Sequence, residues 1–313
     1  MSTAVRRKRN SPNNPVKKEK EDSILSKKKN DVKEPLVSWR KLLGRFLFTV
    51  LILGVIFFST MHKSVNEIIF ASQRETIDRR SHRVNCSPDY DKEKHLASCL
   101  PKICGRVVTD TLITPEEAQQ LLKLAKKGFS YGESDGGASI LDLYSGALSM
   151  GRKFVNIYKN PEYANMFTED DFKVYRNVKT KIQSTISMEF GAMPNDLYPT
   201  QPTFFSRITS KAAKTIHDEY WHPHVDKETY ESFHYTSLLY LSNYGVTFSG
   251  GQFVFIDKNI NATIEPKLGR LSMFTSGSEN LHYVEKVVSG ERFALTISFT
   301  CDKKFAIKQI GPK

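Results

Sequence analysis

The chain has 313 residues and a formal net charge of +12 at pH 7, from 46 Lys and Arg against 34 Asp and Glu. This length accommodates one sizeable domain plus appendages. Residues 1–45 carry 14 basic and 5 acidic side chains, so the other 268 residues have a net charge of only +3. The folded part is therefore nearly neutral. This argues against nucleic acid as a partner and assigns the basicity to an N-terminal tail.

Residues 1–41 are interpreted as a disordered, basic, cytoplasmic tail. They are rich in Lys, Asn, Ser and Pro and show no apolar periodicity, so they cannot bury a core. The basic run at residues 6–9 fits an early-secretory retention signal or contact with anionic lipid. It fits equally well a solvated charge run that only sets topology.

Residues 42–61 are predicted to be a transmembrane signal anchor. Phe46 to Met61 contains no charged residue, and its 16 residues span about 24 Å as a helix. With the residues from Leu42 and a snorkelling Arg45, the segment approaches the hydrocarbon thickness of ~30 Å. A core helix would show a polar face, and a signal peptide would not follow some forty polar residues.

Basic residues on the N-terminal flank of this segment set its expected orientation. Arg40, Lys41 and Arg45 predict a cytosolic N-terminus and a type II protein whose catalytic domain is lumenal. The short apolar span favours the thinner membranes of the endoplasmic reticulum and early secretory pathway. Two sequons, at Asn85 and Asn261, would then accept N-glycans.

Residues 62–105 are polar and are interpreted as a lumenal stem. Three of the four cysteines lie there, at Cys86, Cys99 and Cys104, and Cys301 lies near the end of the chain. In an oxidising compartment this distribution suggests disulfides, and four cysteines allow three pairings. Nothing in the sequence fixes the oligomeric state.

Residues 106–313 are expected to form the folded domain, which begins with helical signals. A capping box that starts at Thr114 opens a helix ending near Gly128. A second helix is capped by Thr168 and ends at Gly191. Its apolar stripe predicts one buried face packed against a sheet.

From Tyr198 to Cys301 the apolar period changes to two, which is typical of strands. Eight strands are predicted, at Thr203–Thr209, Tyr220–Asp226, His234–Ser242, Gln252–Phe255, Ala262–Pro266, Arg270–Phe274, His282–Val287 and Phe293–Thr300. So many short strands in about a hundred residues indicate a mainly β, α+β fold. We expect a double-stranded β-helix, or jelly roll, with the two helices bracing one sheet.

The main chemical signal is the set His224, Asp226 and His282. Residues two apart on a strand face the same side, so His224 and Asp226 can both point at one ion. His282 would supply a third ligand from a distant strand. Two imidazoles and a carboxylate form the facial triad that holds Fe(II) and leaves coordination positions open for a bidentate co-substrate and O2. The alternative is a tetrahedral zinc site.

Arg292 distinguishes these alternatives. Its guanidinium is always charged and can bind the far carboxylate of a keto-acid such as 2-oxoglutarate through two parallel hydrogen bonds. Thr296, four residues further along the predicted strand, faces the same side and could add a hydroxyl group. A zinc site would give no use for these two residues.

An ordered series of motifs extends this pattern over residues 199–302. The series comprises His224-Val225-Asp226, Thr236-Ser237-Leu238-Leu239-Tyr240-Leu241-Ser242, Gly250-Gly251-Gln252-Phe253, Ile264-Glu265-Pro266-Lys267, Leu271-Ser272-Met273-Phe274, His282 and Gly290-Glu291-Arg292-Phe293-Ala294-Leu295-Thr296. In order and approximate spacing it resembles the Fe(II)/2-oxoglutarate-dependent dioxygenases, specifically the prolyl 4-hydroxylase branch. N-terminal to about residue 195 the resemblance is architectural at best, so it does not cover substrate recognition.

The resemblance implies roles for individual residues. His224, Asp226 and His282 would bind Fe(II), Arg292 would hold the C5 carboxylate of 2-oxoglutarate, and Tyr240 would hydrogen-bond the same co-substrate. O2 would be the second co-substrate and ascorbate a reductant. The collagen-type enzymes have Lys at the position of Arg292, and the oxygen-sensing enzymes have Arg.

These observations predict a dioxygenase that hydroxylates a protein or peptide, on a prolyl or another side chain, and releases succinate and CO2. The alternative is a membrane-anchored interaction protein that keeps the fold without turnover. His222 shares the predicted strand face with the triad and could compete as a ligand. The family spacing favours His224 and places His222 at the rim.

Overall fold

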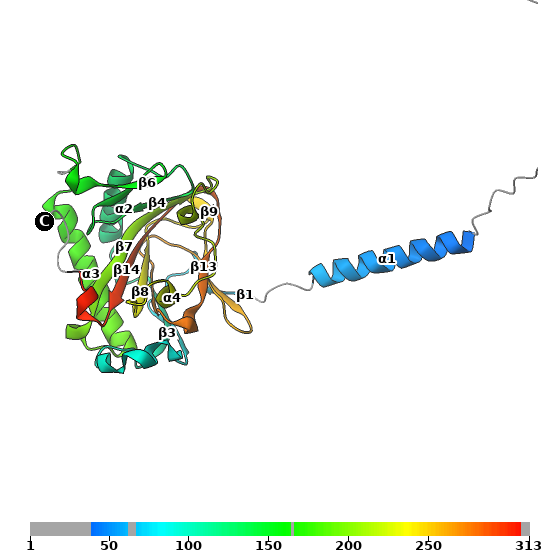
Figure 1. Cartoon of the computed structure of the whole chain (residues 1–313), viewed down its shortest axis with the longest axis horizontal. Coiled ribbons are helices and arrows are strands. Elements are labelled where there is room, and N and C mark those ends of the chain that lie inside the picture. Colours follow the sequence, from blue (N-terminus) through cyan, green and yellow to red (C-terminus); the bar gives the residue numbers. More distant parts are fainter. Residues whose placement is uncertain (1–38, 62–66, 164–165, 308–313) are drawn as a thin grey trace, which may run out of the picture. The chain divides into compact units, whose positions relative to one another are not determined.

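The computed structural model describes residues 39–61, 67–163 and 166–307 (Figure 1). The predicted tail lies outside these residues, apart from its last three. The chain divides into two units, Met1–Lys63 and Ser64–Lys313.

The first unit contains one described helix, α1 (Trp39–Met61). Across the residues that the structure describes, no helix combines the length and apolar character needed to cross a membrane. Arg40, Lys41 and Arg45 all lie inside α1 and leave 16 uncharged residues, about 24 Å of helix, against ~30 Å of hydrocarbon. On this finding the signal anchor predicted at 42–61 is wrong. The type II topology and the lumenal, early-secretory location that depended on it are wrong as well.

The second unit is built on a large antiparallel sheet with the order β2-β3-β12-β8-β14-β7-β4-β5-β6. Its strands are β2 (Arg80–Val84), β3 (Cys104–Thr109), β4 (Ala138–Leu141), β5 (Ala147–Met150), β6 (Lys153–Asn156), β7 (Tyr198–Thr209), β8 (Tyr235–Tyr240), β12 (Leu271–Thr275) and β14 (Val287–Thr300). A short strand, β9 (Phe248–Gly250), pairs with the start of β14. The long strands β7 and β14 lie side by side at the centre of this sheet.

A smaller sheet has the order β1-β11-β10-β13. Its strands are β1 (Glu67–Ala71), β10 (Phe253–Phe255), β11 (Asn261–Ile264) and β13 (His282–Val284). Buried side chains from both sheets form one cluster, which includes Leu238 and Phe274 from the large sheet and Phe253 and Phe255 from the small one. Two sheets enclosing such a core form the predicted jelly roll.

Two helices cover the other face of the large sheet (Figure 1). They are α2 (Pro115–Phe129) and α3 (Glu169–Phe190). The predicted capping box at Thr114 is present, and the predicted cap at Thr168 is part of a second capping box with Asp171. Gly191 ends α3 with φ +76°, a left-handed conformation that favours glycine. The predicted apolar stripe of α3 is buried in the larger core cluster, between the helices and the sheet.

The remaining helices are short: η1 (Pro88–Leu96), η2 (Ile157–Lys159), η3 (Pro194–Asp196), η4 (Ile216–Asp218), α4 (Asp226–Thr229), η5 (Ser278–Asn280) and η6 (Lys303–Phe305). Seven of the eight predicted strands overlap strands of the structure, at shifted bounds. The exception is Tyr220–Asp226, which forms a turn, an isolated β-bridge and the first residue of α4. The prediction of a strand there was wrong.

The segment interpreted as a stem is built into the folded unit. β1 pairs with β11, and β2 pairs with β3. Two disulfides, Cys86–Cys104 and Cys99–Cys301, select one of the three pairings that the sequence left open. The second bridge ties this N-terminal segment to the end of β14 across 202 residues of sequence.

Candidate metal centre and co-substrate site

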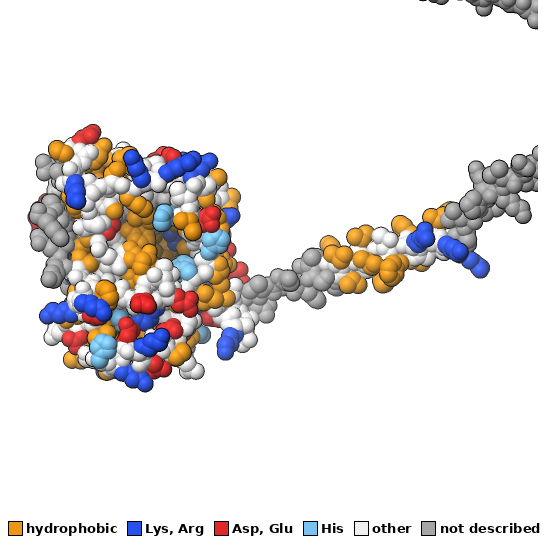
Figure 2. All heavy atoms as spheres, viewed as in Figure 1, with side chains coloured by type: hydrophobic (Ala, Val, Ile, Leu, Met, Phe, Trp, Pro, Cys, Tyr) orange, Lys and Arg blue, Asp and Glu red, His pale blue; other side chains and the backbone are white. Residues whose placement is uncertain are grey.

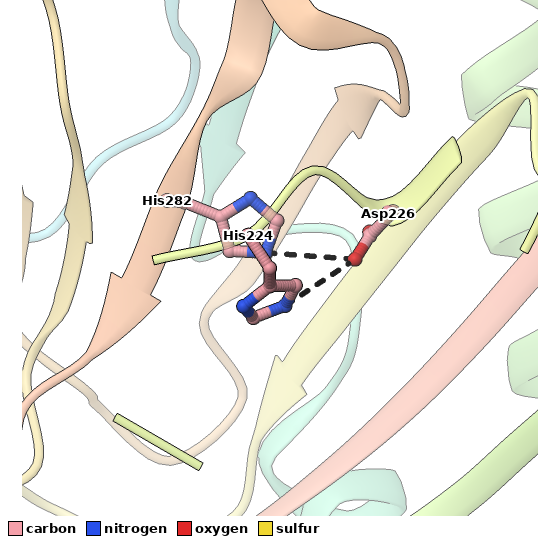
Figure 3. A group of neighbouring side chains, drawn as sticks. All are labelled: His224, Asp226 and His282. Atoms are coloured by element: carbon pink, nitrogen blue, oxygen red, sulfur yellow. Dashed lines mark ion pairs between the residues drawn. The ribbon is translucent and has the colours of Figure 1, made fainter. Parts of the chain in front are cut away.

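His224, Asp226 and His282 come together, although no regular strand carries the first two (Figure 3). The backbones of His224 and His282 form an isolated antiparallel bridge, with N–H···O distances of 2.9 and 3.1 Å. Asp226 follows as the first residue of α4. Its Oδ1 lies 3.6 Å from Nε2 of each histidine, and the three potential ligand atoms lie within 4.8 Å of one another.

Hydrogen bonds orient the three potential ligands. Nδ1–H of His224 donates to the carbonyl oxygen of His222 at 2.9 Å, and Nδ1–H of His282 donates to that of Asn280 at 2.8 Å. These donors leave the lone pair of each Nε2 free, directed at Asp226 Oδ1. The hydroxyl of Thr236 donates to the other carboxylate oxygen, Oδ2, at 2.5 Å. One oxygen of Asp226 is thus held by the protein, and one faces the histidines.

The two histidines have different surroundings. The His282 side chain is 4% exposed and packs against the rings of Phe253 and Phe274, whose centroids lie 4.9 and 5.0 Å away. Burial lowers the pKa of His282, which keeps it neutral as a metal ligand must be. His224 is 41% exposed and lies on the open side of the site. One side of the triad is therefore dry and packed, and the other faces solvent.

The triad lines a cavity of about 600 Å³. The inward faces of four adjacent strands of the large sheet, β4, β7, β14 and β8, form one wall. The segment from Ile216 to Asp226 forms part of the rim. Figure 2 shows the hollow on this face of the molecule, with hydrophobic side chains at its floor and histidines at its edge.

Arg292 lies in the same cavity and is 1% exposed. Its Nε–H donates to the carbonyl oxygen of Gly251 at 2.8 Å, whereas its buried Nη2 has no hydrogen-bond partner. Burial lowers the pKa of this guanidinium, although the group stays charged. Gly251 permits the close approach, because a Cβ at this residue would lie 3.0 Å from Cδ of Arg292 and its φ is +68°. A buried cation with an unpaired donor is the feature that a carboxylate ligand would satisfy.

The other predicted co-substrate residues lie near Arg292. Tyr240 is fully buried, its hydroxyl has no partner, and its ring centroid is 5.5 Å from the guanidinium carbon. It does not itself line the cavity. Thr296 does line the cavity, and it lies on the same strand as Arg292, β14. His222 is exposed at the rim, where its Nε2 lies 2.9 Å from Oε2 of Glu219, so it is not part of the triad.

Two residues that organise the site, Thr236 and Asp218, were not predicted from the sequence. Thr236 belongs to the β8 motif, but its contact with Asp226 depends on how β8 lies beside α4. Asp218 is 1% exposed and accepts hydrogen bonds from Ser134, Ala138 and the backbone at Thr215. It joins the β4 edge to the rim segment. An Asp in a turn gives no sequence signal for such a long-range role.

Comparison with known proteins extends this picture. Residues 210–300 match the family model of the 2OG-Fe(II) oxygenase superfamily. A Xenopus tropicalis protein named 2-oxoglutarate and iron-dependent oxygenase domain-containing protein 3 is 56% identical over 246 residues, which cover 78% of this chain and 77% of that protein. The chain belongs to the 2-oxoglutarate and iron-dependent oxygenases.

Other relatives agree with this membership. The Homo sapiens protein of the same name as the Xenopus one is 54% identical over 242 residues, covering 77% of this chain and 76% of that protein. Prolyl 3-hydroxylase 2 of Gallus gallus is 42% identical over 71 residues, covering 22% of this chain and 10% of that protein. Membership of the family implies Fe(II) and 2-oxoglutarate, with O2. The residues present fit both groups, because the triad offers three metal ligands and Arg292 offers an unpaired cationic donor.

Proposed function

We propose that this oxygenase is catalytically active and hydroxylates a protein or peptide. In the balanced reaction, 2-oxoglutarate, O2 and a substrate C–H give succinate, CO2 and a substrate C–OH. One oxygen atom of O2 enters succinate and the other enters the hydroxyl group. The observation that carries the proposal is the presence in one cavity of the triad and of Arg292, whose Nη2 has no partner.

In this proposal, His224, Asp226 and His282 hold the metal. Fe(II) bound there supplies the O2 chemistry that no protein side chain can supply. The protein keeps the site ready for the ion: the backbone bridge fixes the two imidazoles, and Thr236 fixes the carboxylate. Little reorganisation is then needed on binding, which favours affinity and a defined geometry.

In the same proposal, Arg292 binds the C5 carboxylate of 2-oxoglutarate. The guanidinium is already oriented by Gly251 and is desolvated by its surroundings, so solvent screens its attraction to a bound anion less than at the protein surface. Thr296 and Tyr240 would add hydroxyl donors to the co-substrate. Tyr240 reaches it only if its hydroxyl, now without a partner, turns into the cavity.

Two features support a protein or peptide as the substrate. Ile216 and Tyr230 line the cavity yet are 79% and 44% exposed, and exposed apolar side chains at a rim are typical of a surface that contacts another chain. One relative, prolyl 3-hydroxylase 2, is named for the modification of a prolyl residue. We therefore include a prolyl residue among the candidate targets.

The direct test measures succinate release by the full chain with Fe(II), 2-oxoglutarate and ascorbate. Iron-dependent binding of 2-oxoglutarate is measured in parallel, because turnover without a substrate can be slow. His224→Ala should abolish metal-dependent binding. Arg292→Ala should retain iron and lose 2-oxoglutarate affinity by at least about a hundredfold, since two charge-assisted hydrogen bonds are lost.

The outcomes separate the alternatives. Wild-type protein that neither binds 2-oxoglutarate nor releases succinate would favour an interaction protein that retains the fold. One zinc per chain after native purification, without iron uptake, would favour a zinc site. Binding that is unaffected by Arg292→Ala would place the co-substrate elsewhere.

A further inference from the structure

The part of the cavity wall away from Arg292 is an apolar platform. It is made by inward-facing residues of β4 and β7, and its partly exposed members are Ile140, Pro202 and Phe204. The strand register places Ile140 opposite Ser206 on β7, and Phe204 opposite Thr296 on β14. The platform therefore lies directly beside the proposed co-substrate strand.

Strand alternation explains why these side chains remain uncovered. Their neighbours in sequence, Leu141 and Phe205, point to the opposite face and are fully buried against the helices. Ile140 and Phe204 face the cavity, where no side chain of the described residues completes their burial. An apolar surface left open inside a cavity is the part of a site that a ligand covers.

The charged side chains that line the cavity lie elsewhere. The triad and Arg292 are committed to the metal and the co-substrate in the proposed function. Glu219 is the remaining lining carboxylate, and it lies at the exposed rim, 2.9 Å from His222. A charged target side chain lying on the platform would thus lose water without gaining an ion-pair or hydrogen-bond partner from the platform. Its binding free energy would be less favourable than that of an apolar side chain.

We propose that the platform selects the target, and that this oxygenase hydroxylates an uncharged, apolar residue of a peptide rather than Lys, Arg, Asp or Glu. The inference rests on the proposed function and adds the substrate class to it. An aliphatic C–H of the target is replaced by C–OH, with one oxygen atom from O2, while 2-oxoglutarate loses CO2 and becomes succinate. Ile216 and Tyr230 at the rim contact residues flanking the target.

The test incubates the full chain with Fe(II), 2-oxoglutarate, ascorbate, ¹⁸O2 and a library of short randomised peptides. Mass spectrometry then identifies the residue types that gain ¹⁸O. We expect ¹⁸O on apolar residues such as Pro, Val, Leu or Ile, at least about tenfold above charged residues. Equal or greater labelling of charged residues overturns the inference.

Two other outcomes are also decisive. Iron-dependent binding of 2-oxoglutarate without ¹⁸O in any peptide overturns the inference about the platform and leaves the co-substrate site intact. No binding of 2-oxoglutarate means that the proposed function itself fails. The two failures are therefore distinguishable by the binding measurement alone.

A matched pair of variants connects the labelling to the platform. Ile140→Asp places a carboxylate on the platform and should lower ¹⁸O incorporation into apolar residues at least about tenfold, with 2-oxoglutarate affinity retained. Met188→Asp on α3, a residue that is 75% exposed and outside the cavity lining, should change neither. Unchanged labelling by Ile140→Asp argues against the platform. If that variant does not fold, the wild-type library still decides.

Discussion

Arg292 should destabilise the protein whenever no carboxylate is bound to it. The group is 1% exposed and has one hydrogen bond, to the carbonyl of Gly251, while Nη2 has none. Removing an uncompensated buried charge recovers several kcal/mol of desolvation. Leaving the Gly251 carbonyl without its donor costs about 1–3 kcal/mol. Arg292→Met should therefore raise the free energy of unfolding of the ligand-free protein by about 1–3 kcal/mol.

Arg270 provides the matched control. It is fully buried as well, but its guanidinium donates to both carboxylate oxygens of Asp110, at 2.8 and 2.9 Å, and to three backbone carbonyls. Arg270→Met removes both hydrogen bonds from the guanidinium to the Asp110 carboxylate, which keeps Lys267 as a cation at 3.8 Å, and should cost about 3–5 kcal/mol. Two buried arginines replaced by the same residue should thus change stability in opposite directions.

Denaturant unfolding of the metal-free protein measures both effects. In a second series, with Fe(II) present throughout, addition of 2-oxoglutarate should stabilise the wild type by about 2.7 kcal/mol at a hundred times its Kd, and should add no stability to Arg292→Met. If Arg292→Met proves as destabilising as Arg270→Met, the guanidinium has a structural partner and the reasoning fails. If Arg292→Met still gains stability from 2-oxoglutarate, the co-substrate is held by other residues.

Three further predictions concern the parts that support the site. Asp218→Asn puts an amide donor against backbone N–H donors and should lower the free energy of unfolding by about 1–3 kcal/mol. Amide hydrogen exchange at residues 134–138 and 214–218 should become faster, and unchanged exchange there would refute the role of Asp218. Burial lowers the pKa of His234 below 6.5, and hydrogen bonds hold that of Glu93 at about 2. Both shifts predict that the free energy of unfolding is highest at neutral pH and decreases as the pH falls. The His234 phase begins below about 6.5, and the Glu93 phase runs from about 4.5 towards 2. His234→Gln should remove the first phase when denaturation is measured as a function of pH. Replacing both Cys99 and Cys301 by Ser should lower the free energy of unfolding by about 2–5 kcal/mol, and a loss below 0.5 kcal/mol would show that the bridge contributes little.

Some features were readable in the sequence because the physics behind them is local. The Thr168 cap, the acidic first turn and the apolar stripe define α3 from one short stretch of sequence, and strand alternation located seven strands. The choice of His224, Asp226, His282 and Arg292 as the candidate site came from their chemistry and from the ordered motifs. The membrane anchor predicted over residues 42–61 was wrong, because none of the described helices has the length and apolar character that crossing a membrane requires.

The backbone around the triad was decided only by tertiary structure. The sequence placed His224 and Asp226 on one face of a strand, whereas the structure has a bridge to His282 and the start of α4. The two side chains converge because a partner 58 residues from His224 pairs with its backbone, and Thr236 turns the carboxylate. Neither contact leaves a periodic signal.

By itself, the sequence determined which atoms are available for chemistry: two imidazoles, a carboxylate and a guanidinium on a mainly β scaffold. Tertiary structure decided that the guanidinium is buried with an unpaired donor and that Ile140 and Phe204 are left uncovered in the same cavity. Whether a polar atom has a hydrogen-bond partner, or an apolar surface is buried by other side chains, depends on every element packed around it. That sum over distant segments cannot be read from any one stretch of the chain.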